Sequence, residues 1–228
     1  MRGRVVQIDV GGCEGCSVSF LRATSGNMND AVNLYTVNRT IDELFEEMEV
    51  VLISGAVCID EEEIVETVKE ARRKANVIVA FGSCASFGGI MRFSRGGQEP
   101  RPSHRFFVPV SKVIDVDYTL PGCPPPAPTI KSFINALLNK EEKLALFSKL
   151  SKIKKLSGFD LIDDVVLAGL CIGCGACEIS CPTNAIKLID KIPNLMAEKC
   201  IRCGTCYVRC PRSTKLVIMR GEKNDNTR

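Results

Sequence analysis

CIGCGACEISCP at residues 171–182 is repeated with few changes as CIRCGTCYVRCP at residues 200–211. This repeat determines the fold of the C-terminal part of the chain. Each copy has three cysteines at two-residue gaps, then a fourth cysteine that is followed by proline. Three thiols so close together form a tight loop around a [4Fe-4S] cube, whereas zinc sites usually pair two distant CxxC knuckles. The repeat therefore predicts two [4Fe-4S] clusters rather than two zinc sites.

The fourth cysteine of each copy is expected to start a helix that points away from its own loop, so it should bind the other cluster. The ligands of the first tail cluster are then Cys171, Cys174, Cys177 and Cys210, and those of the second tail cluster are Cys200, Cys203, Cys206 and Cys181. Small residues in both loops should let backbone amides approach the cluster sulfurs and help set the reduction potential. They are Gly173, Gly175, Ala176 and Gly204.

The first 140 residues, which precede the repeat, alternate between strand-like and helix-like segments. Strands are predicted at 4–10, 33–37, 50–57, 77–81 and 113–120, and helices at 41–48, 60–75 and 127–138. The runs VVLISGAV and VIVAFG are continuously apolar, which is typical of parallel strands covered on both faces. This pattern predicts a doubly wound α/β domain. Asp60 is a plausible N-cap of the second helix.

The composition changes along the chain and suggests the domain organisation. We expect an α/β domain at 1–139, a lysine-rich linking amphipathic helix at 140–160, a small α+β ferredoxin-like domain at 161–220 and a polar tail at 221–228. Residues 215–219 are predicted to form a closing strand. A GxGxxG turn for a flavin or dinucleotide is lacking, so we expect this chain to be one subunit of a larger enzyme.

Charge and cysteine usage narrow the class further. The chain has 228 residues, 45% hydrophobic content and a net charge of +3 with acids and bases intermixed, so neither nucleic acid nor a membrane surface is expected as a partner. Neither membrane insertion nor a signal peptide is expected, and we predict a cytoplasmic protein. The odd count of 13 cysteines argues against a disulfide framework.

Five cysteines remain outside the repeat: Cys13, Cys16, Cys58, Cys84 and Cys123. Most of them follow a predicted strand, and the carboxyl ends of parallel strands meet at one edge of the sheet. We therefore expect them to converge on a third cluster, with five thiols competing for four positions. Cys58 lies in the apolar run GAVCI and also fits a buried small hydrophobe. Asp60, in the same loop, could serve as a carboxylate ligand or as a helix cap.

Three motifs resemble the small subunit of [NiFe] hydrogenases: GCEGCSVSF at 12–20, AFGSCASFGG at 80–89 and LPGCPPP at 120–126. The resemblance implies a flavodoxin-like domain that holds the cluster nearest the active site. The ligands of that cluster map onto Cys13, Cys16, Cys84 and Cys123. Ser54 departs from the pattern, because many small subunits have a glutamate at this place.

The resemblance is most specific to the gamma subunits of coenzyme F420-reducing hydrogenases of methanogenic archaea. It rests on RFSRGGQ at 92–98, His104, IDVDYTLPGCPP at 114–125 and the fused two-cluster tail. The resemblance implies a hetero-oligomer with a NiFe large subunit and an FAD- and F420-binding subunit. The NiFe centre and the FAD would lie in these partners. No catalytic residue is then expected here, and three [4Fe-4S] clusters would relay electrons from hydrogen oxidation to the flavin.

Alternatives remain open at the level of sequence. The chain could be an orphan electron-transfer subunit docked to a different oxidoreductase, or a ferredoxin-like carrier acting alone, although a simple carrier does not need the α/β domain. A structural zinc protein is a further alternative. His104 could tune a cluster, but all three clusters already have four cysteines, which favours a loop or interface histidine.

Overall fold

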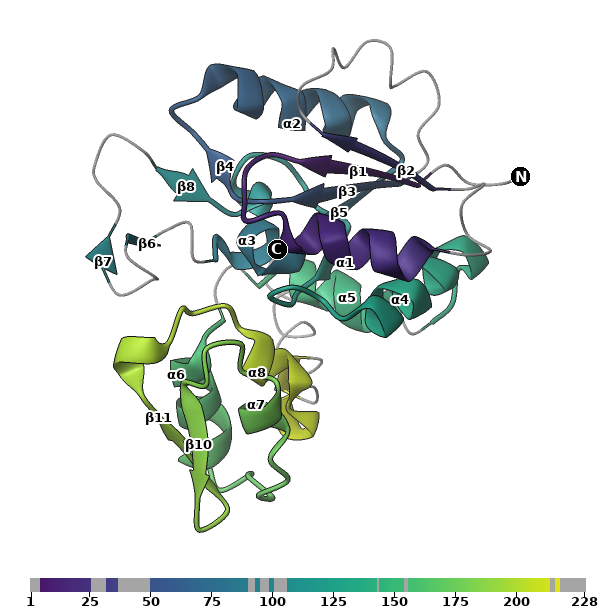
Figure 1. The fold of residues 1–228 in the computed structure, drawn as a ribbon. Helices are drawn as coiled ribbons and strands as arrows, with labels where there is room; N and C mark the ends of the chain where they lie inside the picture. Colours follow the sequence, from purple (N-terminus) through teal and green to yellow (C-terminus); the bar gives the residue numbers. More distant parts are fainter. Residues whose placement is uncertain are drawn as a thin grey trace, which may run out of the picture.

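The structure, a computed structural model, describes residues 5–25, 32–36, 50–89, 93–94, 99–100, 106–142, 144–153, 156–213 and 216–217. Its centre is a five-stranded sheet (Figure 1). The strand order is β2 (Val32–Thr36), β1 (Val5–Asp9), β3 (Val50–Ser54), β5 (Val77–Phe81) and β9 (Tyr118–Leu120). Each pairing in this sheet is parallel, which confirms the predicted α/β class.

Alternating apolar side chains let the sheet bury both of its faces. In β3, Val51 and Ile53 belong to the apolar core on one face, whereas Val50 and Leu52 belong to the core on the other. Helix α2 (Glu62–Lys74) covers the first face with Val68 and Ala71. The chain therefore forms three layers, as in a doubly wound fold.

The opposite face is covered by α1 (Gly15–Thr24), α4 (Ala127–Asn139) and α5 (Leu144–Ser151), as Figure 1 shows. Phe133 of α4 joins two of these helices, because its ring packs edge-on against Phe147 of α5 with 4.8 Å between the ring centroids. Helix α3 (Gly82–Phe87) follows β5 directly, at the carboxyl edge of the sheet.

Short strands lie outside the main sheet: β4 (Val57–Cys58) pairs with β8 (Phe107–Val108), and β6 (Phe93–Ser94) pairs with β7 (Glu99–Pro100). The 3-10 helix η4 (Val110–Lys112) follows β8. Among the helices of the described ranges, none has the length and apolarity needed to cross a membrane.

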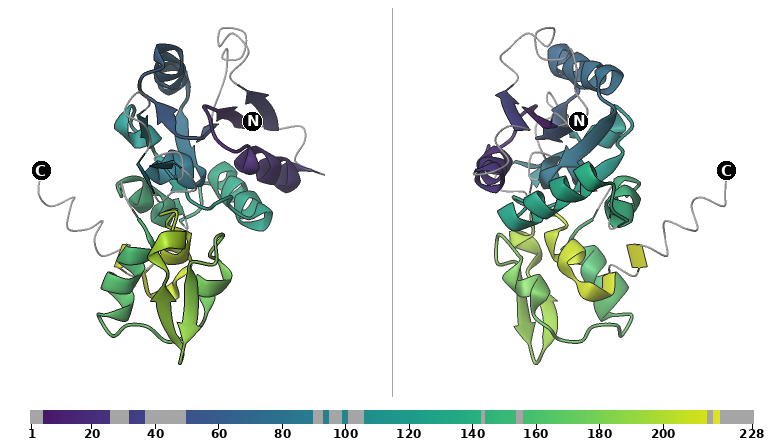
Figure 2. Two further views of the ribbon diagram at one scale, coloured as in Figure 1. Left: turned by 60° about the vertical axis from the view of Figure 1, so that its left-hand side comes forward. Right: turned by 90° about the vertical axis from the view of Figure 1, so that its right-hand side faces the viewer.

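A smaller domain lies at one end of the molecule (Figure 2). It contains α6 (Gly158–Leu161), the π-helix η5 (Ile162–Val166), α7 (Ala176–Ile179), the hairpin β10 (Ile186–Ile189) and β11 (Ile192–Leu195), the 3-10 helix η6 (Ala197–Lys199) and α8 (Thr205–Arg209). Its core is apolar and includes the fully buried Tyr207. Phe87 of α3 and Leu150 of α5 belong to the same core, so the two domains pack on each other.

Several predicted elements differ from the structure. The main-sheet strand predicted at 50–57 ends at Ser54, and the last strand is only Tyr118–Leu120 because residues 113–117 form turns and irregular backbone. The linking helix extends only over Leu144–Ser151 and packs on the α/β domain. The closing strand is wrong at 216–217, which are helical. The helix predicted at 41–48 and His104 lie outside the described residues.

Candidate metal centres

The carboxyl edge of the parallel sheet brings together four of the five cysteines outside the repeat. Cys13 follows β1, Cys16 lies in the first turn of α1, Cys84 lies in α3 directly after β5, and Cys123 follows β9. Burial raises the pKa of Cys16 most, and the neighbouring thiols Cys84, Cys123 and Cys13 raise it further. These thiols are therefore close enough to interact, although more than one hundred residues separate the first from the last.

Gly82 shows how tightly the backbone approaches these thiols. It has a φ of +85° and lies between β5 and Cys84, and a Cβ added there would collide with the sulfur of Cys16. A side chain would therefore be strained by the backbone and would also fill the space beside the thiol. Glycine at this position therefore keeps the surroundings of Cys16 Sγ free of a side chain.

Cys58 and Asp60 lie apart from this group. Cys58 is buried in β4, and its neighbouring ionisable groups are carboxylates rather than the other thiols. Asp60 accepts a hydrogen bond from the backbone N–H of Phe106 at 2.6 Å. The predicted N-cap role of Asp60 is wrong, because α2 begins after Glu61 and has no side-chain cap.

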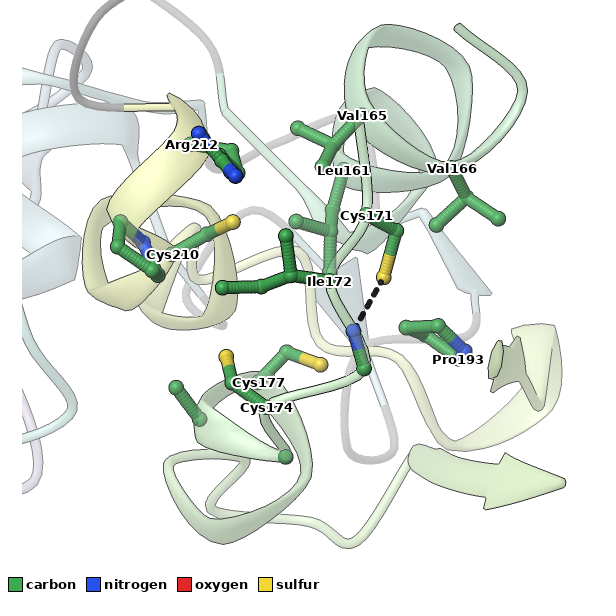
Figure 3. A pocket seen from close by; sticks show the side chains of 14 residues that line it. Leu161, Val165, Val166, Cys171, Ile172, Cys174, Cys177, Pro193, Cys210 and Arg212 are labelled. Atoms are coloured by element: carbon green, nitrogen blue, oxygen red, sulfur yellow. Dashed lines mark hydrogen bonds between the residues drawn. The ribbon is translucent and has the colours of Figure 1, made fainter. Parts of the chain in front are cut away.

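A cavity in the smaller domain is lined by all four cysteines predicted for the first tail cluster (Figure 3). The sulfurs of Cys171, Cys174, Cys177 and Cys210 face a common space of about 360 Å³ that is partly open to solvent. Arg212 is the charged residue of the lining, which is otherwise apolar or glycine. Burial raises the pKa of Cys177 most, and Cys210 and Cys171 add to the shift.

A second cavity, of about 280 Å³, is lined by Cys181, Cys200, Cys203 and Cys206. Burial raises the pKa of Cys206 most, and the other three thiols raise it further. The structure thus groups the eight cysteines of the repeat in the crossed manner expected from the sequence. The helix expected after the fourth cysteine is present in the second copy, where residues 211–213 directly after Cys210 are helical, but Cys181 in the first copy is followed by a turn. The third cysteine of each copy lies in a short helix, Cys177 in α7 and Cys206 in α8.

Hydrogen-bond donors approach the sulfurs unequally in the two cavities. In the first cavity, the Gly173 N–H donates to Cys171 Sγ at 3.5 Å. In the second, the Ala185 N–H donates to Cys181 Sγ at 3.2 Å, and the Thr205 hydroxyl lies 3.3 Å from Cys203 Sγ. Burial raises the pKa of Cys203, and the hydroxyl and backbone N–H of Thr205 oppose that rise.

The donor sets fit [4Fe-4S] clusters. In the described part of the chain, no three His, Cys, Asp or Glu side chains form a group arranged to hold a metal ion. A [4Fe-4S] cluster requires a wider arrangement of ligands than a single metal ion does, because each thiolate binds its own iron at a separate corner of the cube. Four thiols around a space kept free by glycine and apolar side chains meet that demand.

A buried hydrogen bond joins the α/β edge to the second cavity. The Ser83 hydroxyl donates to the backbone carbonyl of Cys203 at 2.6 Å and accepts from the Gly122 N–H at 3.3 Å. Burial raises the pKa of Cys123 to about 12, and Cys203 is the next largest cause. The α/β edge therefore adjoins the second cavity. Sequence patterns did not point to Ser83, because its partner lies in the other domain.

Comparisons with known proteins agree with both halves of the chain. The family "NADH ubiquinone oxidoreductase, 20 Kd subunit" matches residues 13–137, and the family "4Fe-4S dicluster domain" matches residues 164–223. The gamma subunit of coenzyme F420 hydrogenase from Methanosarcina barkeri is 39% identical over 201 residues, which are 81% of this chain and 78% of the relative.

The gamma subunit of coenzyme F420 hydrogenase from Methanococcus voltae is 35% identical over 213 residues, which are 84% of this chain and 87% of the relative. A solved structure of an NAD+-reducing [NiFe]-hydrogenase in the H2-reduced state has a TM-score of 0.49 at 27% identity, and the match covers 62% of this chain and 94% of that chain.

A parallel α/β domain with thiols at its carboxyl edge, joined to a 4Fe-4S dicluster domain, defines an iron–sulfur electron-transfer subunit of an oxidoreductase. Such a subunit carries iron–sulfur clusters, performs no catalysis itself and works within a hetero-oligomer. The chain belongs to the family of coenzyme F420 hydrogenase gamma subunits.

Proposed function

We propose that this chain relays electrons through three [4Fe-4S] clusters, from a NiFe site in a large subunit to a flavin in an F420-reducing subunit. The observation that carries the proposal is the grouping of twelve cysteines into three sets of four, one set at the carboxyl edge of the sheet and one lining each cavity of the smaller domain. When bound, such clusters supply reversible one-electron storage over a wide range of potentials.

The proposed ligand sets follow these three groups of thiols. We assign the α/β cluster to Cys13, Cys16, Cys84 and Cys123, the first tail cluster to Cys171, Cys174, Cys177 and Cys210, and the second tail cluster to Cys200, Cys203, Cys206 and Cys181. Cys58 and Asp60 are left out, since neither lies with the other thiols.

The positions of the sets support an order for the relay. Cys13 is exposed at the α/β edge, where electrons would arrive from the large subunit. The contact of Ser83 with Cys203 supports the second tail cluster as the next carrier. Cys174 of the first tail cluster is exposed, so electrons would leave there for the flavin. We expect the complex to be cytoplasmic.

Anaerobic purification of the whole complex with metal and flavin analysis tests this proposal. We expect about twelve irons for each copy of this chain, together with nickel and flavin in the complex and H2-dependent reduction of F420. About eight irons would contradict the α/β cluster, and retention of iron after Cys13→Ser, Cys84→Ser and Cys123→Ser together would contradict its ligand set.

A second candidate function is electron transfer for a different oxidoreductase. Ser54 favours it, because many hydrogenase small subunits have a glutamate at this place, whereas the Ser54 hydroxyl here donates to Asp9. A complex with about twelve irons for each copy of this chain but without nickel would decide for this candidate.

A further inference from the structure

A partly buried polar network lies at the carboxyl edge of the sheet, next to the loop that carries Cys13 and Cys16. It consists of the side chains of Gln7, Asp9, Ser17 and Ser54, which we call the Asp9 network. Gln7 and Ser54 are fully buried within the sheet. Asp9 and Ser54 are directly opposed in the pairing of β1 with β3. Polar groups in such a position are costly unless they are hydrogen-bonded.

The hydrogen bonds of the network converge on one carboxylate. The hydroxyls of Ser54 and Ser17 lie 2.9 Å and 3.2 Å from Asp9 Oδ2, and the Gly11 N–H donates to Asp9 Oδ1 at 3.0 Å. Ser54 has the Ile8 carbonyl as a second acceptor, but this is more distant at 3.4 Å. Asp9 therefore has three donors.

Gln7 fixes the direction of these bonds. Its Nε2 donates to the hydroxyl oxygens of Ser17 and Ser54, both at 2.9 Å. A carboxylate can only accept, so each hydroxyl must donate its proton to Asp9 and accept from Gln7. The Oε1 of Gln7 is left buried without a partner among the described residues. The network therefore leaves one hydrogen bond of Gln7 unmade, while both hydrogen bonds from its Nε2 orient the hydroxyls that hold the Asp9 carboxylate.

The network lies beside the thiols of the α/β edge. Ser17 follows Cys16 in α1, and Gly11 lies in the loop that leads to Cys13. Asp9 Oδ2 lies 3.2 Å from the hydroxyl of Ser17, the residue next to Cys16, so the carboxylate is held close to the loop that carries this thiol. Asp9 thus places a negative charge beside the thiols of this edge.

We propose that Asp9 sets the reduction potential of the α/β cluster, and that its carboxylate, held by the Asp9 network, makes this cluster a stronger reductant. The inference rests on the proposed cluster at this edge. One-electron reduction adds a negative charge to the cluster, and a nearby fixed negative charge disfavours that form. The α/β cluster would then pass its electron readily to the second tail cluster.

The test is an anaerobic redox titration of the whole complex, followed by EPR, with iron analysis of each sample. The α/β signal is identified as the one altered in Cys13→Ser. Asp9→Asn keeps the Oδ1 acceptor for Gly11 and removes the charge. We expect at least a threefold rise in the ratio of reduced to oxidised α/β cluster at fixed potential, which is about 28 mV for one electron.

Further variants separate charge from structure. Asp9→Glu keeps the charge and should leave the potential close to that of the wild type. Ser54→Ala removes one donor and should shift the potential in the opposite direction, because the carboxylate is then less neutralised. Asp117→Asn is the matched control, since Asp117 binds the Ile78 N–H at the amino edge of the same sheet and should leave the potential unchanged.

The outcomes separate this inference from the proposed function. About twelve irons with an unchanged potential in Asp9→Asn would overturn the inference alone, as would an equal shift in Asp117→Asn. If Asp9→Asn does not assemble, the sign of the shift in Ser54→Ala decides. About eight irons in the wild-type complex would overturn the α/β cluster and this inference together.

Discussion

Two residues distinguish the cysteine loops of the repeat. Residues 171–177 read CIGCGAC and residues 200–206 read CIRCGTC, so Thr205 takes the place of Ala176. The Thr205 hydroxyl lies 3.3 Å from Cys203 Sγ. A ligand thiolate cannot donate, so the hydroxyl would donate to the sulfur and stabilise the reduced cluster.

Thr205→Val should therefore lower the midpoint potential of the second tail cluster. A net loss of about 1 kcal/mol corresponds to about 40 mV for one electron. Ala176→Thr is the mirror variant and should raise the potential of the first tail cluster. EPR-monitored titrations check both changes, and a Thr205→Ser variant that shifts as far as Thr205→Val would contradict the role of the hydroxyl.

A side chain at Gly82 should prevent the α/β cluster from binding. Gly82→Ala should remove about four of the roughly twelve irons, because the added Cβ would collide with Cys16 Sγ. Gly169→Ala is a matched control, since Gly169 also has a positive φ of 70° but no atom within 4 Å of an added Cβ. The control should cost only about 1 kcal/mol of stability and keep all irons. Equal iron content in both variants would contradict the prediction.

At the scale of elements, the π-helix η5 forms one wall of the first cavity with Val165 and Val166. It is fixed to α8 by Asp164, which accepts a hydrogen bond of 2.8 Å from the hydroxyl of Tyr207. Tyr207 is fully buried and follows Cys206, a proposed ligand of the other cluster. This bond therefore ties an element beside one cavity to an element beside the other.

Tyr207→Phe should lower the free energy of unfolding by about 1 kcal/mol, because it removes a partly buried hydrogen bond to a carboxylate and leaves the ring in place. Tyr118→Phe is the control, since Tyr118 is partly exposed and has no hydrogen bond from its hydroxyl among the described residues. Thermal unfolding of the two variant complexes under anaerobic conditions compares them. Equal melting temperatures would show that the Asp164 contact does not stabilise η5.

The elements also show what sequence patterns could predict. The strands β3 and β5 were predictable because their apolar runs must be covered on both faces, and the crossed cysteine sets followed from spacing alone. The hairpin of β10 and β11 was missed. Its turn residues Asp190 and Lys191 have φ of 49° and 64°, as in a two-residue hairpin turn that usually carries Asn-Gly. Here the glycine that would indicate such a turn is absent.

At the scale of the whole molecule, the junction between the domains lies outside the reach of sequence patterns. The Ser83 hydroxyl and the Cys203 carbonyl are separated by 120 residues in the chain. Nothing in the local sequence of Ser83 distinguishes it from Ser86, whose hydroxyl donates to Gly82 within the same helix. Only the packing of the smaller domain on α3 gives Ser83 its partner.

Ser83→Ala should destabilise the chain by about 1–3 kcal/mol, since it leaves the buried Cys203 carbonyl without its donor. Ser86→Ala should cost much less, because the Gly82 carbonyl keeps its place in the helix. Unfolding of both variant complexes, with hydrogen exchange of the peptide around Cys203, checks the difference. Similar exchange in the two variants would show that Ser83 does not hold the junction.

The crossed grouping of cysteines in the smaller domain has a consequence for assembly. Cys181 belongs to the set of Cys200, and Cys210 belongs to the set of Cys171. Insertion of either cluster would link the segment around Cys171 to the segment around Cys200 and bring the ligands of the other cluster close together. Most of the conformational entropy of closing this chain loop is therefore lost when the first cluster binds, and the second cluster binds at little further cost. The two tail clusters should therefore be gained together during maturation and lost together on exposure to air. Native mass spectrometry of partly loaded complexes should show iron leaving this domain in a step of about eight, with few chains that keep about four.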